Sequence, residues 1–452
     1  MIALPLAWLV LAGVGSPLVL FGVLGAASML NRPLTERWTG ILAGGSMGIA
    51  CAALASALVV SGVGRTGPLL LSFGSWSASR AGGIAIEFLV DPAALAFAAL
   101  AAAIAGVVSA FSYRYLHREP GYNRYFVLLS LFVTGMLLVS LAGNVEVLFV
   151  GWELVGLSSA LLVGFFHERP ASVGNALRVF SVYRVSDAAM LSAAVLLRHL
   201  AGTDSLALLF GARGAPAAGL TVANATIIAT LLIVAVAAKS ALLPFSGWLP
   251  RAMEGPTPSS AVYYGSLSIH AGCFLLLRSA PLLVHAPAAR ILAGVLGVAT
   301  AAFAALATRV QSDVKSSLAY ASLTQVGLIV VEIALGWNRI AFVHLAGHAC
   351  FRLLQFLSAP NVLHDLHGME EALPDRSRLA VGLEGLLPDR WRHRLYLFVL
   401  ERGFLDSVLD RVVVTPFTSV ARMLTRLDGR LCGAVLPPGR TLASERTVVR
   451  DE

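Results

Sequence analysis

Long runs of apolar residues, separated by short polar stretches, cover most of the chain. A membrane-spanning α-helix needs about 20 such residues, and each run is long enough. The pattern therefore predicts an all-α polytopic membrane protein with eleven transmembrane helices, contained in a domain of residues 1–360. The predicted spans are 3–30, 39–62, 91–114, 123–142, 145–166, 173–200, 222–242, 257–282, 287–308, 314–335 and 338–358.

The segment 69–90 interrupts this pattern. It mixes apolar and small polar residues around Ser75–Gly83 and carries Phe73 and Trp76, a composition that predicts a short β-hairpin between two helices. No basic stretch precedes the first apolar run, so we expect that run to be the first span and not a cleaved signal peptide.

The character of the chain changes after Pro360. The charged segment 361–390 predicts a cytoplasmic connector. In 391–430, apolar residues recur at helical spacing among arginines and aspartates, which predicts an amphipathic helical region. Such a region is suited to lie on the membrane surface or to dock a partner. The last segment, 431–452, is expected to be a disordered tail.

The distribution of arginine predicts the orientation in the membrane. Arginines in the short loops are divided almost equally between the two sides, whereas the connector and tail add about thirteen more. Because cytoplasmic segments are enriched in Lys and Arg, the C-terminus is expected in the cytoplasm, and an odd number of spans then places the N-terminus outside.

Composition supports a membrane protein. Hydrophobic residues make up 57%, charged residues 13%, and the mean hydropathy is +0.79, which excludes an ordinary soluble domain. The net charge of +8 resides largely in the arginine-rich tail and favours anionic lipid or an acidic partner over nucleic acid. The four cysteines are scattered without a C-x-x-C pair. No metal site, iron–sulfur cluster or disulfide framework is therefore predicted, and no cofactor is expected in this chain.

The chain has only two lysines, Lys239 and Lys315, although Lys and Arg together number 33. Both lie in or beside long apolar segments. An arginine stays protonated in proteins, whereas a desolvated lysine can release and regain a proton. Lysines kept in such surroundings suggest a proton-handling function in a membrane.

A third charged residue, Glu153, lies well inside an apolar run. Charges within a span are costly and mark functional sites by default, although a structural salt bridge is the alternative. Lys239, at the end of another run, is its natural partner. A carboxylate close to a lysine favours the protonated amine, and moving the carboxylate away releases the proton, so the pair can act as a switch.

Arg184 and Asp187 are three residues apart and therefore share one face of a helix. A mutual ion pair and a role in coupling are both compatible with this spacing.

A helix-breaking segment follows Lys239. Four prolines and two glycines fall within fifteen residues, which excludes a regular helix. A discontinuous helix is favoured over a plain loop, because apolar residues separate the prolines. The residues that define this broken-helix region are Pro244, Pro250, Glu254, Pro256 and Pro258.

Histidines add a second group of candidates. His344 and His348 are four residues apart on one face of an apolar helix, and Arg352 follows one turn later. No third ligand accompanies them, so a hydrated proton relay is favoured over a metal site. Lone His270 fits either a packed residue or a relay member, and Lys315, beside Asp313, fits an interfacial charge.

The chain resembles the antiporter-like membrane subunits shared by respiratory complex I, membrane-bound hydrogenases and Mrp-type cation/proton antiporters. The matching stretches are 152–156, 183–187, 238–258 and 312–326, and the most specific element is Lys239-Ser240 followed by Leu249–Pro258. The resemblance implies that Glu153 and Lys239 are the coupled pair on the ion pathway. It also implies that Lys315 is the central lysine and that His344 and His348 belong to a hydrated axis.

Two further stretches, 244–253 and 347–356, look like the membrane subunit of the DAB inorganic carbon accumulation complex. Where complex I subunits soon place a histidine after the Pro-Thr-Pro turn, this chain has Ser259-Ser260, and spanning stops near Pro360, so the distal helices of the second repeat are expected to be missing. The DAB resemblance implies a large soluble partner subunit, cytoplasmic and zinc-containing, that carries carbonic anhydrase-like chemistry.

The leading hypothesis is therefore a subunit of the bacterial cytoplasmic (inner) membrane that conducts H⁺ or Na⁺ and couples it to accumulation of CO2 or bicarbonate. Such a chain is not an enzyme by itself. One alternative is a proton-translocating subunit of a complex I-like NADH-quinone oxidoreductase or membrane hydrogenase. The other alternative is a non-conducting membrane scaffold.

Overall fold

The computed structural model of the protein describes residues 3–63, 68–75, 85–209, 220–311, 313–372, 394, 397–399 and 402–435. The tip of the predicted hairpin, most of the predicted connector and the tail from residue 436 lie outside these residues. Within them, eleven helices are long and apolar enough to cross a membrane, which confirms the predicted number of spans.

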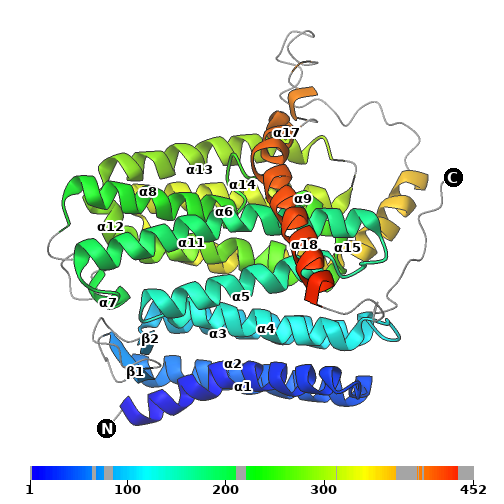
Figure 1. Cartoon of the computed structure of the whole chain (residues 1–452), viewed down its shortest axis with the longest axis horizontal. Coiled ribbons are helices and arrows are strands. Elements are labelled where there is room, and N and C mark those ends of the chain that lie inside the picture. The colour runs from blue at the N-terminus through cyan, green and yellow to red at the C-terminus, as the bar shows by residue number, and fades with distance from the viewer. Residues whose placement is uncertain are drawn as a thin grey trace.

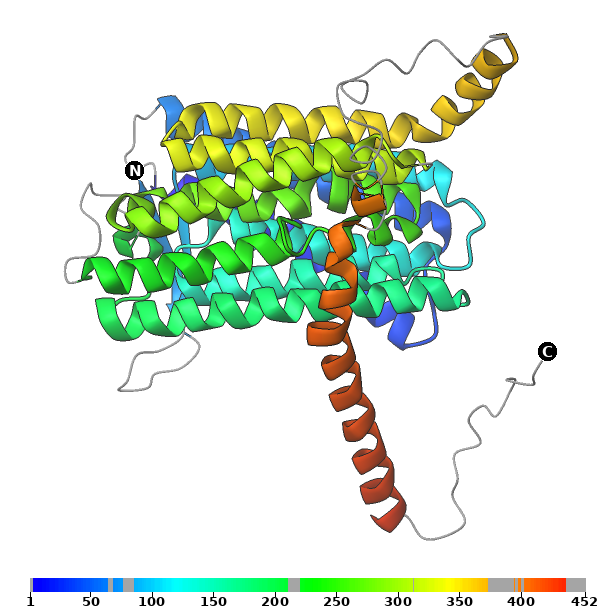
Figure 2. The same cartoon turned by 90° about the horizontal axis from the view of Figure 1, so that it is seen from above.

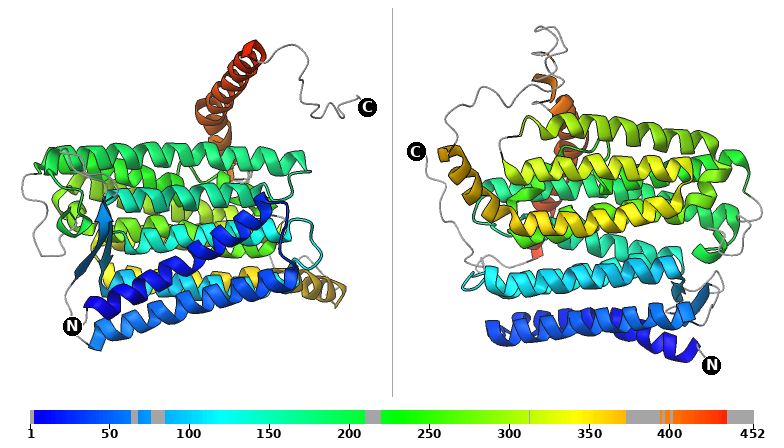
Figure 3. Two further views of the ribbon diagram at one scale, coloured as in Figure 1. Left: turned by 60° about the horizontal axis from the view of Figure 1, so that its bottom comes forward. Right: turned by 180° about the vertical axis from the view of Figure 1, so that it is seen from behind.

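The spanning helices lie side by side in one bundle (Figure 1). They are α1 (Ala3–Met29), α2 (Glu36–Val63), α3 (Pro92–Tyr115), α4 (Tyr122–Leu141), α5 (Val145–Val163), α6 (Pro170–Ala201), α8 (Val222–Lys239), the composite span Thr257–Arg278, α13 (Pro287–Thr308), α14 (Val314–Leu335) and α15 (Asn338–Ala372). The short helices α7 (Leu206–Leu209) and α12 (Ala280–His285) connect neighbouring spans. Helices α1 and α2 form one edge of the bundle (Figure 3).

The spans begin and end at residues that satisfy free backbone groups. Asp91 accepts a hydrogen bond from the Ala94 amide at the start of α3, and Asn144 accepts one from Val147 at the start of α5. Side-chain caps of this kind replace the bonds that the first helical turn lacks.

Close packing of the helices depends on glycine. A Cβ at Gly151 of α5 would lie 2.8 Å from the Gly135 carbonyl oxygen of α4, and a Cβ at Gly297 of α13 would lie 2.7 Å from the Gly327 oxygen of α14. Small residues allow backbones to approach this closely, which is how helices associate in lipid.

The predicted hairpin is present as two antiparallel strands, β1 (Leu69–Ser75) and β2 (Ala85–Val90), with Leu69 opposite Val90. It lies at one end of the bundle (Figure 3). The Gly143 amide, between α4 and α5, donates a hydrogen bond of 2.8 Å to the Glu87 carbonyl oxygen, so the hairpin holds this turn in place.

The discontinuous helix is also confirmed. Helix α8 ends at Lys239, and the chain then passes through an irregular segment into α9 (Trp248–Arg251) and a 3₁₀ turn, η1 (Ala252–Glu254). The following span combines α10 (Thr257–Ser259), a π-helix, η2 (Ser260–Leu267), and α11 (Ser268–Arg278).

The C-terminal part differs from the prediction at two points. Helix α18 continues through Val435, whereas the disordered tail was predicted to begin at residue 431. Helix α15 continues through Ala372, whereas the connector was predicted to begin at residue 361. Residues such as Leu363, Leu366 and Ala372 favour helix, and Pro360 does not end it.

The amphipathic region forms η5 (Arg402–Phe404), α17 (Leu405–Leu409), the π-helical η6 (Asp410–Val414) and α18 (Thr415–Val435). Helix α18 crosses the direction of the spanning helices and extends away from the bundle (Figure 2).

Candidate functional site

Lys239 lies at the C-terminal end of α8 and is completely buried. Its Nζ donates a hydrogen bond of 2.9 Å to the Trp152 carbonyl oxygen. The ammonium also lies 4.4 Å from the centre of the Tyr183 ring and 5.1 Å from that of Trp152. One carbonyl and two aromatic faces thus hold the cation, and such faces attract it electrostatically. A Cβ at Gly156 would lie 2.8 Å from Nζ, so glycine makes room for the amine.

An acid–base network lies beside this lysine. The Arg184 Nη2 is 2.9 Å from Glu153 Oε2 and 2.7 Å from Asp187 Oδ2. The Arg184–Asp187 pair predicted from the sequence is therefore formed, and Glu153 belongs to the same network. Asp187 is buried, whereas the side chains of Glu153 and Arg184 are 29% and 32% exposed, so the network is accessible from outside the protein at these two residues.

The direct pairing of Glu153 with Lys239 is not observed. Within the described residues, Lys239 has no carboxylate oxygen within 4.0 Å, because Arg184 occupies both neighbouring carboxylates while the lysine points at Trp152. The charges of Asp187, Glu153 and Arg184 still act on Lys239 through space. The arrangement is one lysine beside a three-member network and not a simple ion pair.

Trp152 and Ser186 fix the geometry of this site. The Trp152 Nε1 donates to Ser186 Oγ at 3.0 Å, and that hydroxyl donates to the Ala235 carbonyl oxygen at 2.7 Å. Helices α5, α6 and α8 are thereby linked one turn away from Lys239. Neither residue was predicted from the sequence to have a role, although the tryptophan directly precedes Glu153 in the chain.

The broken-helix region directly follows the lysine in the chain. The Trp248 Nε1 donates to the Ala238 carbonyl oxygen at 3.0 Å, and the Leu243 amide donates to Thr300 Oγ1 at 3.0 Å. Backbone groups freed by the break thus find partners inside the protein. Of the residues that define this region, Pro250, Pro256 and Pro258 are buried, whereas Pro244 and Glu254 are exposed.

The histidines form a second polar cluster. His270 Nε2 lies 2.9 Å from His348 Nδ1, and Arg352 Nε donates to His348 Nε2 at 3.0 Å. The arginine can only donate, so His348 Nε2 accepts and its proton resides on Nδ1, directed at His270. The two neutral imidazoles therefore form a hydrogen-bonded chain that begins at Arg352.

His344 has a separate set of partners. Its Nδ1 lies 2.9 Å from Glu332 Oε1 and its Nε2 lies 3.0 Å from Gln325 Oε1. Its ring centre is 6.3 Å from that of His348. The structure therefore brings the two predicted histidines and His270 together in one cluster.

Lys315, the central lysine by the resemblance, lies apart from both polar clusters. It lies in the first turn of α14, two residues after Asp313, whose side chain caps the helix by accepting from the Ser316 amide at 2.8 Å. Lys315 is partly buried near the end of its span and belongs to neither cluster. The buried cation of the second cluster is Arg352, which is 7% exposed.

One hydrogen bond links the two clusters. The Ser240 Oγ donates to the Ile269 carbonyl oxygen at 2.6 Å, so the residue after Lys239 contacts the residue before His270. A Cβ at Gly272 would lie 2.1 Å from Ser240 Oγ, which shows how closely α11 approaches this serine.

Two models of known protein families match the chain. A family model described as NADH:quinone oxidoreductase/Mrp antiporter, TM, matches residues 142–381. A second model, described as NADH-Ubiquinone oxidoreductase (complex I), chain 5 N-terminus, matches residues 76–126. The first match contains both polar clusters and the broken helix.

Curated relatives agree with these models. The chain is 33% identical over 374 residues to NADH-quinone oxidoreductase subunit L of Mycobacterium tuberculosis, which covers 79% of this chain and 58% of the relative. It is 33% identical over 318 residues to NADH-ubiquinone oxidoreductase chain 5 of Schizophyllum commune, covering 70% and 45%. The chain thus spans about half of the length of the curated relatives it matches.

Solved structures share the fold. A chain of the Mrp complex from Dietzia sp. DQ12-45-1b is 29% identical with a TM-score of 0.63, and the match covers 78% of this chain and 37% of that one. A chain of the membrane-bound sulfane sulfur reductase, an archaeal respiratory membrane complex, has a TM-score of 0.66 at 19% identity, covering 77% and 70%, and this supports the fold alone. The chain therefore belongs to the NADH:quinone oxidoreductase/Mrp antiporter family of multi-pass membrane proteins.

Proposed function

We propose that this chain translocates protons across the membrane as the antiporter-like subunit of a multi-subunit complex of the complex I and Mrp type. The observation that carries the proposal is Lys239, a fully buried lysine without a carboxylate within 4.0 Å among the described residues. Burying a charge within a span is costly, so a buried charge marks a functional residue by default. Lysine, unlike arginine, can also give up its proton.

The network beside Lys239 supplies a way to move that proton. Arg184 now neutralises Glu153 and Asp187. If Arg184 swings away from Glu153, the freed carboxylate favours a protonated Lys239, and its return favours proton release. Glu153 and Arg184 are the partly exposed members, so they are the ones free to move. This two-position network is the proposed switch.

The histidine cluster supplies the next proton carriers. The Nδ1 proton of His348 already points at His270, and an imidazole can accept a proton on one nitrogen and release one from the other. The Ser240–Ile269 hydrogen bond places this cluster next to the lysine. Arg352 stays charged and holds His348 in one orientation.

A proton fits this site better than a sodium ion. The groups closest to the pathway include Lys239, Arg184 and Arg352, which repel a metal cation, whereas lysine and histidine bind protons reversibly. In the described part of the chain, no cluster of three or more His, Cys, Asp or Glu side chains is positioned to hold a metal ion.

Coupling to inorganic carbon accumulation is a second candidate. It is supported by the stretches 244–253 and 347–356, which include Trp248, His348 and Arg352, all used in the site. The partner would then be the large soluble zinc-containing subunit on the cytoplasmic side, and this chain would conduct the driving cation. The relatives found by comparison support the respiratory alternative better. A non-conducting scaffold would not need a buried Lys239.

The test is proton flux in liposomes that contain the full chain. Glu153→Gln should reduce flux, because the neutral amide can no longer attract the proton to Lys239. Glu168→Gln is the matched control, because this carboxylate is 70% exposed and lies at the end of the bundle. Equal flux in both variants and the unaltered protein would overturn the proposed switch. Sodium uptake without proton movement would replace H⁺ by Na⁺.

A further inference from the structure

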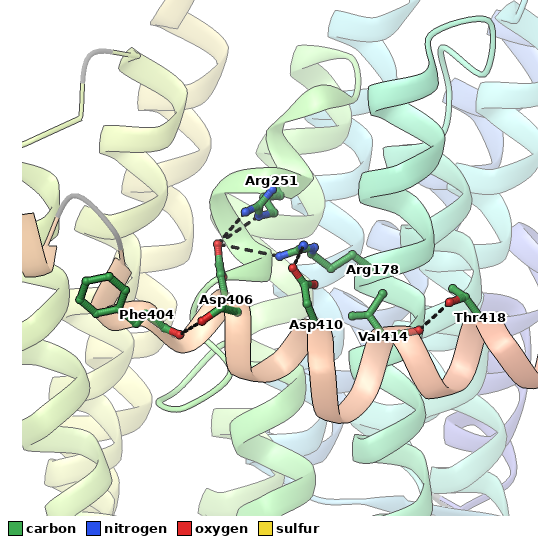
Figure 4. Close-up of polar contacts among 8 residues, drawn as sticks. Arg178, Arg251, Phe404, Asp406, Asp410, Val414 and Thr418 are labelled. Atoms are coloured by element: carbon green, nitrogen blue, oxygen red, sulfur yellow. Dashed lines mark hydrogen bonds and ion pairs between the residues drawn. The ribbon is translucent and has the colours of Figure 1, made fainter.

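The C-terminal segment is attached to the membrane domain through two aspartates. Asp406 Oδ2 accepts from Arg251 Nη2 at 2.7 Å and from Arg251 Nε at 3.2 Å, and lies 3.9 Å from Arg178 Nη1 (Figure 4). Asp410 forms an ion pair with the Nη2 of Arg178. We call these four residues the aspartate clamp. It joins residues that are 155 and 232 positions apart in the sequence.

The two arginines come from different elements of the candidate site. Arg178 lies on α6, the helix that carries Tyr183, Arg184 and Asp187. Arg251 ends α9, the short helix of the broken region. The clamp therefore joins α6, whose Tyr183 contacts Lys239, to the short helix that follows Lys239 in the chain.

The backbone at Gly247 is shaped for this contact. A Cβ at this position would lie 1.7 Å from Asp406 Oδ1, so no other residue fits while the aspartate is in place. Gly247 directly precedes α9, and the carboxylate thus contacts the broken helix through both Gly247 and Arg251.

The next residue, Trp248, connects the clamp to the lysine. It is fully buried, packs edge to face on Tyr183 with ring centres 5.1 Å apart, and donates to the Ala238 carbonyl oxygen at 3.0 Å. Tyr183 in turn holds the Lys239 ammonium against its ring. A shift of Trp248 would therefore change the surroundings of Lys239 from two sides.

We propose that Asp406 and Asp410 are positioning residues that fix the broken helix against α6 and thereby set the surroundings of Lys239. The side chains of Arg178 and Asp406 are only 15% and 14% exposed, so water replaces the lost partner poorly when one member is removed. The effect on Lys239 rests on the proposed proton translocation. The link between the C-terminal segment and the membrane domain does not depend on that proposal.

The link itself is tested by hydrogen exchange of the full chain in lipid nanodiscs. Asp406→Asn should speed amide exchange about tenfold in residues 240–251 and in the first half of α6, since a charge-assisted hydrogen bond is lost. Arg411→Gln is the matched control, because it removes an exposed charge from the same helical segment without touching the clamp. Unchanged exchange in Asp406→Asn would overturn the proposal.

A disulfide tests whether position, and not charge, matters. A Cβ at Gly247 would lie 2.8 Å from Asp406 Cγ. A cysteine at position 406 would place its sulfur near that Cγ position, within reach of a disulfide to a cysteine at position 247. Gly247→Cys with Asp406→Cys is made in a chain whose four native cysteines are replaced. When oxidised, this variant should show the parent's exchange and flux, and when reduced it should match Asp406→Asn.

The two failures are distinguishable. If Lys239→Ala abolishes proton flux but flux is the same with the disulfide oxidised or reduced, the positioning role is overturned while proton translocation stands. If exchange follows the disulfide in a protein whose flux does not depend on Lys239, the clamp is supported as a link and the proposed function is overturned.

Discussion

The hydroxyl of Ser240 donates a hydrogen bond of 2.6 Å to the carbonyl oxygen of Ile269, which joins the lysine cluster to the histidine cluster. Ser240→Ala should remove this bond between the two helices and lower the free energy of unfolding by about 0.5–1.5 kcal/mol, because the Ile269 carbonyl keeps its partner within α11. Flux should fall as well, because α8 and α11 are no longer held at this point. Both are measured in liposomes and by thermal unfolding in detergent.

The control is Ser140→Ala, which removes a buried hydroxyl that bonds only within its own helix, to the Met136 oxygen at 2.6 Å. A flux defect as large in the control would contradict a special role for the Ser240 bond.

Gly156 leaves the space that the Lys239 amine occupies. Gly156→Ala would place a methyl group 2.8 Å from Nζ, so the amine must move away from the Trp152 oxygen. Displacements of this size typically reduce the rate on the order of tenfold to a hundredfold. Gly174→Ala, on α6 with nothing within 4 Å of its added methyl, should have no effect. Equal flux in the two variants would show that the position of the amine is unimportant.

Glu87 on β2 predicts a pH dependence of stability. Burial, followed by the charges of Asp204 and Glu146, raises the pKa of this carboxyl above its ordinary value of 4.5. Because the pKa is higher in the folded state, the protonated carboxyl favours folding. Its contribution to the free energy of unfolding is fully present below about pH 4.5 and is lost as pH rises through the folded-state pKa. The melting temperature should therefore fall over this range in the unaltered protein, and less so in Glu87→Gln. Parallel curves for the two proteins would contradict the assignment.

Helix α18 carries two opposed stripes. Val420, Leu424 and Leu427 are 51%, 57% and 44% exposed, and Arg422, Arg426 and Arg430 lie on the other side at helical spacing. A helix of this kind that runs across the spanning direction should lie in the membrane surface. A spin label at position 424 should be accessible to oxygen dissolved in the lipid. A spin label at position 426 should be accessible to a water-soluble relaxant. Water access at both positions would contradict this orientation.

Much of the fold was predictable, because a bilayer leaves the backbone few choices. The apolar runs predicted eleven spans, the prolines after Lys239 predicted the broken helix, and the segment around Gly74 predicted the hairpin. Each of these signals is local in the sequence. The Arg184–Asp187 pair, three residues apart on one helix, was predictable for the same reason.

The tertiary contacts of the site were not predictable in this way. Glu153 was matched to Lys239 on charge alone, but Arg184 competes for the carboxylate, and the rotation of α5 and α6 decides the outcome. His270 and His348 are 78 positions apart, and Asp406 and Arg251 are 155 apart. No periodicity connects such residues, so their contacts depend on how the helices pack.

Proton flux through Lys239 is the most direct test of the account. Full-length protein is reconstituted into liposomes with a pH-sensitive dye inside, and Lys239→Ala and Lys239→Arg are compared with the unaltered chain under an imposed membrane potential. Both variants should reduce flux to the level of empty liposomes, because alanine carries no proton and arginine does not release one. Flux that persists in Lys239→Arg at the unaltered rate would show that the buried charge, and not proton exchange at this residue, is what the protein requires.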